Sequence, residues 1–376
     1  MKLILSISFF AFGIFSAIAQ ISHVTEEFLL PSNLTESSGI IFFNNKLITH
    51  NDSGGGNKLY ELDLTTEQVT RIVTITNATN IDWEDITQDD TSIYIGDIGN
   101  NNGNRTDLKI YKISKTDYLN STNITAEIIN YSYSDQTDFT SNPNNTVWDA
   151  EALASFDAVN LLLFTKNWVD GITKSYIVPK TQGTHSINPQ LSTLSSNGLI
   201  TGGTYNTISG KLYLIGYDDL LQPFVWVSDG FNANDMFSGT NTQTLISSLG
   251  FEQTEAITFI DKNSYLVTSE SFSVSRGLFT VSDDAKLISF STSDEALSNT
   301  TNQNNHDILV YPNPTSNILI IESDNLSSIE IFDIQHKHLH HGYEKIIDIS
   351  HFSTGIYFIK VYFKNNTFNV KKFLKQ

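Results

Sequence analysis

The chain contains no cysteine, so disulfides, thiolate nucleophiles and cysteine-ligated metals are all excluded. Helical periodicity is nearly absent, which argues against a helical fold. Beyond the first 19 residues no apolar run is long enough to cross a bilayer, so no transmembrane segment is expected. A chain of 376 residues can nevertheless be held together by its hydrophobic core alone.

Basic residues are scarce, and the deficit is unevenly distributed. The chain has 22 Lys plus Arg and 41 Asp plus Glu, and the net charge is −19. From residue 307 onward seven lysines balance seven acidic residues, so the whole excess of acid precedes that point. Such a surface repels nucleic acid, and no nucleic-acid partner is expected. Acidity can simply keep an exported protein soluble, but it also suits hard cations that prefer oxygen ligands.

The first residues have the pattern of a secretory signal peptide. Lys2 provides a positive charge, residues 3–15 form a short apolar run, and Ala17-Ile18-Ala19 fits a cleavage site. We therefore predict a signal peptide over residues 1–19 and export from the cytoplasm.

Short runs of β-branched and aromatic residues alternate with Gly, Asn, Asp and Ser clusters, which is typical of an all-β fold. Five segments share a similar start and recur at spacings of 46, 67, 46 and 58 residues. They begin at Ser38-Gly39-Ile40-Ile41, Glu84-Asp85-Ile86-Thr87, Glu151-Ala152-Leu153-Ala154, Asn197-Gly198-Leu199-Ile200 and Glu255-Ala256-Ile257-Thr258.

A second and a third apolar strand follow each start, and a weaker fourth often follows those. In the last repeat the third strand is expected at residues 278–281 and the fourth at 286–290. Four antiparallel strands that repeat every 40 to 60 residues predict the blades of a β-propeller over residues 20–290.

Five blades are expected, with a sixth, degenerate blade between residues 113 and 148 as an alternative. Residues 23–30 have strand character but no blade of their own, so we predict that they complete the last blade and close the ring. A pair of β-sandwiches is the rival architecture.

In each blade the start of the first strand and the end of the second lie at the same end of the sheet. Acidic side chains from several blades should therefore gather on one face. The predicted metal ligands are Glu84, Asp85, Glu151 and Glu255, with Ca²⁺ as the expected ion. The predicted ligand-binding residues are Asp52, Asp82, Asp97, Arg105, Asp149 and Glu270.

Purely structural interpretations also remain open for these residues. The carboxylates could instead accept hydrogen bonds from backbone N–H groups at blade junctions. Arg105 could clamp an anionic ligand, or it could form a structural bridge with Asp97 or Glu84.

The segments Asp82-Trp83-Glu84-Asp85-Ile86 and Asp149-Ala150-Glu151-Ala152-Leu153 resemble uncharacterised secreted β-propeller proteins. More distantly they are similar to lactonase-like and phytase-like propellers. That resemblance implies a metal on the acidic face, but it does not fix a ligand set.

Residues 291–307 are polar and are predicted to be a linker. After them, Val310-Tyr311-Pro312-Asn313-Pro314, the strand Ile329-Glu330-Ile331-Phe332-Asp333 and the segment Ser353-Thr354-Gly355-Ile356-Tyr357 occur in order, before a lysine-bearing terminal strand. Residues 308–376 thereby resemble the type A C-terminal sorting domain of type IX secretion. The resemblance implies a small Ig-like β-sandwich, recognition by an outer-membrane translocon, and a secreted or cell-surface location.

The sequence favours a binding module of a secreted or cell-surface protein. A calcium- or metal-dependent propeller hydrolase, lactonase-like or phosphoesterase-like, is the main alternative, and a purely structural surface protein is another. No Gly-x-Ser-x-Gly or His-Glu-x-x-His pattern occurs, so no catalytic residue is assigned and whether the protein is an enzyme stays open.

Overall fold

The structure is a computed structural model that describes residues 21–276, 279–294, 308–323, 326–333, 337–364 and 368–376. The chain divides into two compact units, residues 1–296 and 297–376, and each is described by itself. The predicted signal peptide and most of the predicted linker lie outside the described residues. None of the described helices has the length and apolar character needed to span a membrane.

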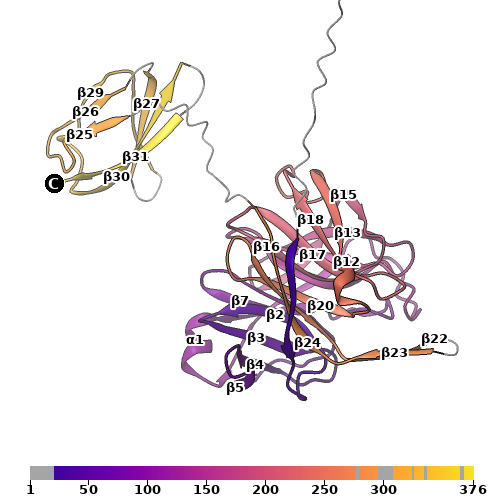
Figure 1. Ribbon diagram of the computed structural model, residues 1–376. Coiled ribbons are helices and arrows are strands. Elements are labelled where there is room, and N and C mark those ends of the chain that lie inside the picture. The colour runs from indigo at the N-terminus through magenta and orange to yellow at the C-terminus, as the bar shows by residue number, and fades with distance from the viewer. Residues whose placement is uncertain (1–20, 277–278, 295–307, 324–325, 334–336, 365–367) are drawn as a thin grey trace, which may run out of the picture. The chain divides into compact units, whose positions relative to one another are not determined.

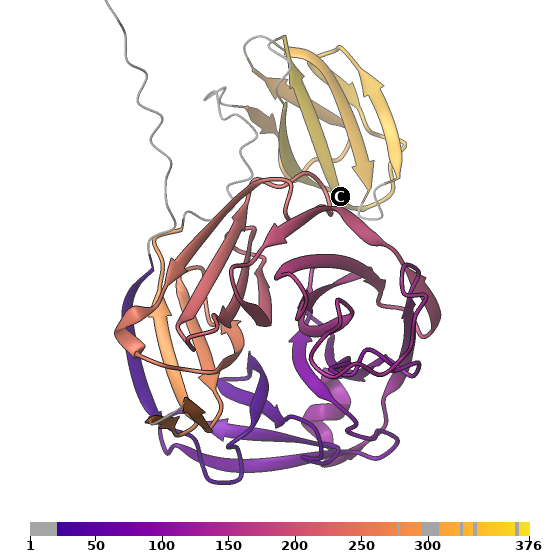
Figure 2. The same cartoon turned by 90° about the vertical axis from the view of Figure 1, so that its right-hand side faces the viewer.

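Five sheets, each with four antiparallel strands and here called blades I to V, make up most of the first unit (Figures 1 and 2). Blade I contains β2 (Ser37–Phe43), β3 (Lys46–Asn51), β4 (Lys58–Asp63) and β5 (Gln68–Ile75). Blade II contains β6 (Trp83–Gln88), β7 (Ser92–Asp97), β8 (Lys109–Ser114) and β10 (Glu127–Tyr133).

The remaining blades follow the same order. Blade III contains β11 (Asp149–Ser155), β12 (Asn160–Lys166), β13 (Ile172–Pro179) and β15 (Pro189–Ser195). Blade IV contains β16 (Leu199–Asn206), β17 (Lys211–Tyr217), β18 (Pro223–Asp229) and β19 (Thr240–Leu245). Blade V contains β20 (Thr254–Phe259), β21 (Ser264–Ser269), β24 (Lys286–Ser291) and β1 (Ser22–Leu29).

The first strand of every blade is innermost, and these five strands form a closed circuit. Strand β2 contacts β6, β6 contacts β11, β11 contacts β16, β16 contacts β20, and β20 contacts β2 again. Figure 2 shows the resulting ring of sheets. The predicted propeller is therefore confirmed, and the pair of β-sandwiches is excluded for this unit.

Strand β1 closes the ring, as predicted, by pairing antiparallel with β24 from Ser22↔Ser291 to Leu29↔Lys286. The strand assignment in blade V was wrong in one respect. Strand β24 is the third strand, because it pairs with β21. The predicted third strand falls in β23 (Phe279–Asp283), which pairs only with β22 (Phe272–Arg276) in a separate two-stranded sheet, with Leu278 outside the described residues.

Residues 113–148 form no sixth sheet among the described residues. The short helix α1 (Lys115–Asn120) leads into β9 (Asn123–Ile124), which adds parallel to β5 of blade I. Strand β10 then becomes the fourth strand of blade II, and β14 (Gly183–Ile187) adds parallel to its outer side. A short 3₁₀ helix, Ser247–Leu249, precedes β20.

Apolar side chains fill the space between neighbouring blades. Between blades I and II, Ile48, Leu59, Trp83, Ile93 and Ile95 are all 0% exposed. Because each sheet buries both faces in this way, a blade is stable only between two others.

The innermost strands approach one another closely around the axis. Each first strand has a β-bulge at the same place, and the residue after the bulge is small or fully buried. These residues are Gly39, Asp85, Ala152, Gly202 and Ala256. A Cβ added to Gly202 would lie 2.5 Å from the Glu255 carbonyl oxygen and 3.0 Å from Ala256 Cα. At this level the ring therefore has room only for glycine, alanine and the single side chain of Asp85.

The second unit is a small sandwich of two sheets. One sheet contains β25 (Leu309–Tyr311), β26 (Ile318–Glu322) and β29 (Ile346–Asp348), and the other contains β28 (His338–Gly342), β27 (Leu326–Asp333), β30 (Gly355–Phe363) and β31 (Phe368–Lys375). Their inner faces share one core that includes Leu319, Ile329, Ile347, Ile359 and Phe373. This agrees with the small sandwich predicted from the sequence.

The lack of space at the axis gives a prediction for Gly202→Ala. The added Cβ meets backbone atoms of the next innermost strand, so the ring must distort. We expect a loss of roughly 1–3 kcal/mol in the free energy of unfolding and a melting temperature lower by about 3–10 °C. Gly355→Ala is the control, because its Cβ would come no closer than 3.9 Å to Tyr357. Equal melting temperatures for the Gly202→Ala variant and the parent would contradict the close approach.

Candidate functional site

The β-bulge of each innermost strand places one residue at a topologically equivalent position on one face of the ring. The register of each blade shifts around Ser38, Glu84, Glu151, Thr201 and Glu255. Bulges bend a strand and re-aim a side chain, often beside a functional site. Four of these side chains, all except Thr201, line one cavity near the axis.

The two hydroxyl residues at the bulge position link neighbouring blades. Ser38 Oγ donates to the carbonyl oxygen of Trp83 at 2.8 Å, and Thr201 Oγ1 donates to the carbonyl oxygen of Thr254 at 2.5 Å. In each case the acceptor directly precedes the bulge residue of the next blade. A short hydroxyl side chain thus meets the structural need of this position.

Glutamate occupies the same position in the other three blades. Glu84, Glu151 and Glu255 are only 5%, 3% and 6% exposed. Glu151 is paired with Lys166 Nζ at 2.6 Å. Glu84 and Glu255 accept no hydrogen bond and form no ion pair among the described residues. Two buried carboxyl groups thus point into the cavity without a protein partner.

The end of the second strand supplies a second layer of side chains. Asp52, Lys166, Tyr217 and Glu270 occupy equivalent places there, in blades I, III, IV and V. All four line the cavity, which has a volume of about 230 Å³. Its full lining is Ser38, Asp52, Glu84, Asn101, Asn144, Glu151, Lys166, Trp168, Tyr217, Gln253, Glu255 and Glu270. Five carboxyl groups therefore face a single ammonium group.

Three of the acidic residues lie close enough to share one ion. One carboxylate oxygen each from Asp52, Asp82 and Glu84 lie within 4.8 Å of one another. Asp52 directly follows β3, Asp82 directly precedes β6, and Glu84 is the bulge residue of β6. The backbone of Gly99 packs against them, since a Cβ there would lie 2.1 Å from Glu84 Oε1 and 2.4 Å from Asp82 Oδ2.

Burial and mutual repulsion raise the pKa values of these carboxyl groups. Burial raises the pKa of Glu84 well above its usual range, and the charges of Glu151, Asp52 and Asp82 raise it further. Burial and then Glu270 raise the pKa of Glu255 well above its usual range. Burial, together with charges that include Asp52, raises the pKa of Asp82 and of Glu270 to about 7. These raised pKa values mean that the binding of protons or of a cation stabilises the cluster.

Lys166 is the cation within this cluster. Burial alone would lower the pKa of Lys166. The pKa is nevertheless held well above its usual range by the neighbouring Glu151, Tyr217 and Glu255. Its ammonium group also lies 4.9 Å from the centre of the Trp168 ring. Burial raises the pKa of Glu151 despite the opposing effect of Lys166. One lysine therefore offsets only part of the acidic charge.

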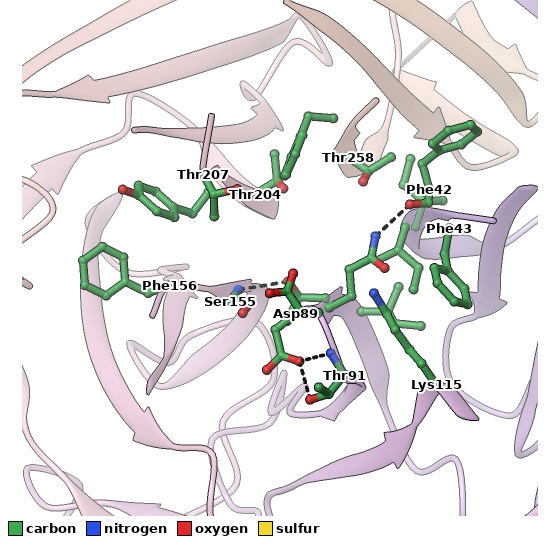
Figure 3. Close-up of a pocket in the computed structure, with 18 of the residues that line it drawn as sticks. Phe42, Phe43, Asp89, Thr91, Lys115, Ser155, Phe156, Thr204, Thr207 and Thr258 are labelled. Atoms are coloured by element: carbon green, nitrogen blue, oxygen red, sulfur yellow. Dashed lines mark hydrogen bonds between the residues drawn. The ribbon is translucent and has the colours of Figure 1, made fainter. Parts of the chain in front are cut away.

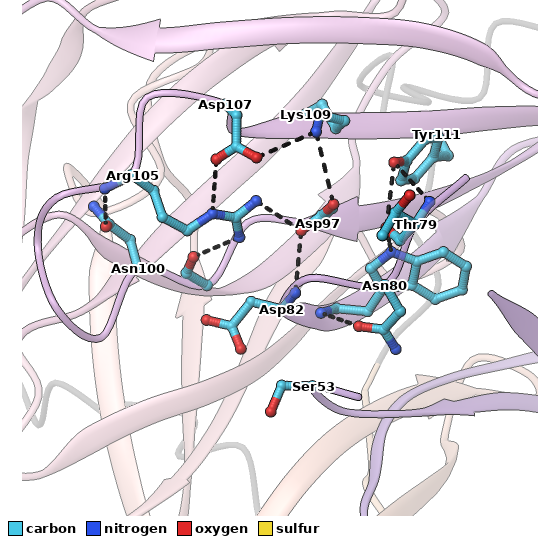
Figure 4. A network of polar contacts seen from close by, with 12 residues as sticks. Ser53, Thr79, Asn80, Asp82, Asp97, Asn100, Arg105, Asp107, Lys109 and Tyr111 are labelled. Atoms are coloured by element: carbon cyan, nitrogen blue, oxygen red, sulfur yellow. Dashed lines mark hydrogen bonds and ion pairs between the residues drawn. The ribbon is translucent and has the colours of Figure 1, made fainter. Parts of the chain in front are cut away.

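Arg105 and Asp97 belong to a structural network beside the cavity (Figure 4). Arg105 Nη2 donates to Asp97 Oδ1 at 2.8 Å, Nη1 donates to the Gly99 carbonyl oxygen at 2.8 Å, and Nε donates to Asp107 at 3.1 Å. Asp97 also accepts the Asp82 backbone N–H at 3.2 Å. The structural bridge considered for Arg105 is the arrangement found, and Arg105 and Asp97 hold Asp82 in position rather than line the cavity.

Asp149 and Asp85 also bind protein groups. Asp149, fully buried, accepts the Asn100 backbone N–H at 2.5 Å and the Trp168 indole N–H at 2.7 Å. Asp85 points to the axis and accepts the backbone N–H groups of Leu153 at 2.8 Å and Gly203 at 3.3 Å, from blades III and IV. The two residues follow the backbone-satisfying alternative, and neither lines the cavity.

The sequence interpretation left out Lys166, Tyr217, Gln253 and Ser38 as site residues. A blade-by-blade alignment on the second strand would have found Lys166 and Tyr217, because both occupy the position of Asp52 and Glu270. The unusual signal is a lysine and a tyrosine where two other blades carry acids.

Residues 309–376 match the family described as "Secretion system C-terminal sorting domain". This match confirms the sorting domain suggested by the sequence motifs, and it indicates secretion or attachment at the cell surface. The sorting domain covers only the second unit and says nothing of the propeller's ligand. No curated protein matches the chain.

Solved structures similar to the chain are propeller-like proteins. The PQQ-bound aldose sugar dehydrogenase of Streptomyces coelicolor is 9% identical, with 73% of this chain and 99% of that chain covered and a TM-score of 0.41. The calcium-binding protein regucalcin of Agrobacterium tumefaciens is 14% identical, with coverages of 74% and 95% and a TM-score of 0.35. The WD40 domain of Toxoplasma gondii coronin is 11% identical, with coverages of 74% and 90% and a TM-score of 0.33. Likenesses at these scores carry no information about ligand or activity.

The protonated cluster gives a prediction for stability against pH. An acid whose pKa is raised by folding binds more protons in the folded state, so its contribution falls as pH rises toward the folded pKa. Burial lowers the pKa of His50 to about 4, which acts in the opposite direction but only below about 6.5. Without divalent cations, the free energy of unfolding should therefore fall between pH 6.5 and 8.

Each extra bound proton corresponds to about 1.4 kcal/mol per pH unit. Urea unfolding in EDTA at the two pH values measures the change for the propeller transition. Glu84→Gln should reduce the slope, because glutamine carries no titrating proton. A stability that is flat or rises over this interval would contradict the protonated cluster.

Proposed function

We propose that the propeller is a calcium-dependent binding module of an exported protein. The observation that carries this proposal is the bulge position. Two blades fill it with a hydroxyl that joins the blades, whereas three fill it with glutamate, and two of those carboxyl groups have no partner among the described residues. Burying a carboxylate without a partner is costly, so either a bound proton or a bound cation is expected to compensate, and a cation is the compensation that would also give the site a function.

A hard divalent cation fits this donor set best. The first ligands would be Asp52, Asp82 and Glu84, which lie within reach of one ion. Calcium accepts six to eight oxygen ligands, including carboxylates and amide carbonyl groups, whereas transition metals favour imidazole and thiolate. Asn101 and Gln253 add amide oxygens to the same cavity. Positions of the ion not filled by protein would be open to oxygen atoms of a bound ligand.

The two export signals support the cellular setting of the module. The predicted signal peptide would direct the chain across the inner membrane, and the sorting domain would then engage the outer-membrane translocon. Secreted proteins meet millimolar calcium in many environments, which even a weak site can use. A propeller displayed at the cell surface or released into the medium would present its acidic cavity to ligands outside the cell.

Calcium addition to EDTA-treated protein should raise the melting temperature of the propeller. At a calcium concentration 100 times the Kd the expected gain is about 2.7 kcal/mol, or about 5–10 °C. Glu84→Gln should abolish this rise, because it removes a ligand charge, while leaving the melting temperature in EDTA unchanged or higher.

Glu127→Gln is the matched control, since Glu127 lies exposed on β10 and forms an ion pair with Lys112 outside the cavity. It should keep the full response to calcium. Calorimetry that detects no calcium-dependent rise in the parent protein would remove the proposal.

A metal-dependent hydrolase is the second candidate, and Glu270 is the observation in its favour. Its carboxyl group lies in the same cavity, and burial raises its pKa to about 7, which suits a general base at neutral pH. With calcium present, Glu270→Gln should lower the turnover of a lactone or phosphoester at least ~100-fold if Glu270 is that base. Retained calcium binding by this variant, together with no turnover by the parent of either substrate class, would leave the binding module as the function.

A further inference from the structure

A second cavity lies at the opposite face of the ring, and the acidic cluster does not account for it. It has a volume of about 710 Å³, within the range of small-molecule sites. Its walls come from the C-terminal ends of the five innermost strands, whereas the acidic cavity lies at their N-terminal ends. The two cavities share no lining residue, because the buried layer at the axis separates them.

Aromatic side chains from several blades surround this second cavity (Figure 3). Phe42 and Phe43 come from blade I, Phe156 from blade III, Tyr205 from blade IV and Phe259 from blade V. All five are partly exposed. Part of each side chain packs against the core between the blades, and the exposed remainder is available to a ligand.

Two of the rings are held in place by a third. The Phe156 and Tyr205 ring centres lie 5.0 Å apart at 62°, and both lie within 6.5 Å of the Phe231 ring centre. Edge-to-face packing of this kind restrains ring orientation, so these surfaces are pre-organised before any ligand arrives.

Polar groups form the inner part of the same cavity. The hydroxyl groups of Thr204 and Thr258 make no hydrogen bond among the described residues, although the two residues are only 7% and 4% exposed. Gln88 donates its amide N–H to the Phe42 carbonyl oxygen, and its own Oε1 is buried without a partner. A wholly apolar ligand would leave these groups unsatisfied, which costs free energy.

The charged side chains that line this cavity give it no net positive charge. Asp89 accepts Lys180 Nζ at 2.9 Å and the Tyr94 hydroxyl at 2.7 Å. The Lys115 ammonium lies 4.4 Å from the centre of the Phe43 ring and has no carboxylate within 4.0 Å among the described residues. Asp90 and Asp157 add negative charge to the lining. The cavity therefore does not favour an anionic ligand.

We propose that this second cavity binds a neutral oligosaccharide. A pyranose ring has an apolar C–H face that can lie on Phe156 and Tyr205, and a rim of hydroxyl groups that can exchange hydrogen bonds with Thr204 and Thr258. Lys115 provides a donor on the opposite wall. This assignment does not depend on the calcium site, since no residue is shared.

Binding is tested with the full chain against a panel of neutral oligosaccharides of glucose, mannose and xylose, with oligouronates as the acidic comparison. Isothermal titration should show binding of at least one neutral member and no tighter binding of the oligouronates. No binding of any neutral member at millimolar concentration, or binding of oligouronates alone, would overturn the proposal.

Phe156→Ala should weaken the best neutral oligosaccharide at least about tenfold, since an aromatic contact is removed. Thr204→Val, which keeps the shape of the side chain, should weaken it about three- to tenfold through loss of one hydroxyl. Phe139→Ala is the matched control, because Phe139 is exposed outside this cavity.

Glu84→Gln should bind the same sugar with unchanged affinity, which separates this site from the calcium site. Thr204→Val that folds and binds as the parent, together with an unchanged Phe156→Ala variant, would place the sugar elsewhere and overturn the assignment.

Discussion

The absence of space at the ring axis is the constraint on which the rest of the structure depends. Five innermost strands meet there, and at one level they accept only glycine, alanine or the buried Asp85. Asp85 uses this place to accept backbone N–H groups from two other blades. The layer fixes the strands so closely that the ring has two separate mouths instead of one continuous channel.

The bulges next to this layer explain why the acidic cavity exists. A regular strand would alternate its side chains between the two blade interfaces, and both of those are apolar. The bulge interrupts the alternation and turns one residue per blade to the mouth. Where that residue is Ser38 or Thr201, it strengthens the ring. Where it is glutamate, it adds charge that the fold itself does not require.

The sequence was informative about the repeat and less so about the geometry within it. The five starts predicted the blades because strand patterns and turn residues are local properties of the chain. Closure of the ring by β1 was also predictable, since residues 23–30 had strand character and no blade of their own. The third strand of blade V was misassigned because the β22–β23 segment has equal strand character, and only pairing in three dimensions decides between them.

The site prediction was limited for the same reason, because spacing along the chain does not determine how side chains are arranged in three dimensions. Spacing alone placed Glu84, Glu151 and Glu255 in register, and the structure brings all three to one cavity. It could not separate them from Asp85, one residue along, because the bulge that sends neighbouring side chains to different surroundings leaves no mark in composition. Nor could spacing show that Arg105 is fully engaged by Asp97, Asp107 and a backbone carbonyl group.

The pairing of β1 with β24 has a consequence for how the chain matures. Ser22 and Ser291 are partners although 269 residues separate them. The β1–β24 pairing cannot form until almost the entire propeller sequence has left the ribosome, so the ring closes after translation. Strand β1 begins only two residues after the predicted first mature residue, Gln20. Cleavage beyond Ile21 would therefore remove residues that pair with β24. Accurate removal of the leader would then be a condition for a complete ring.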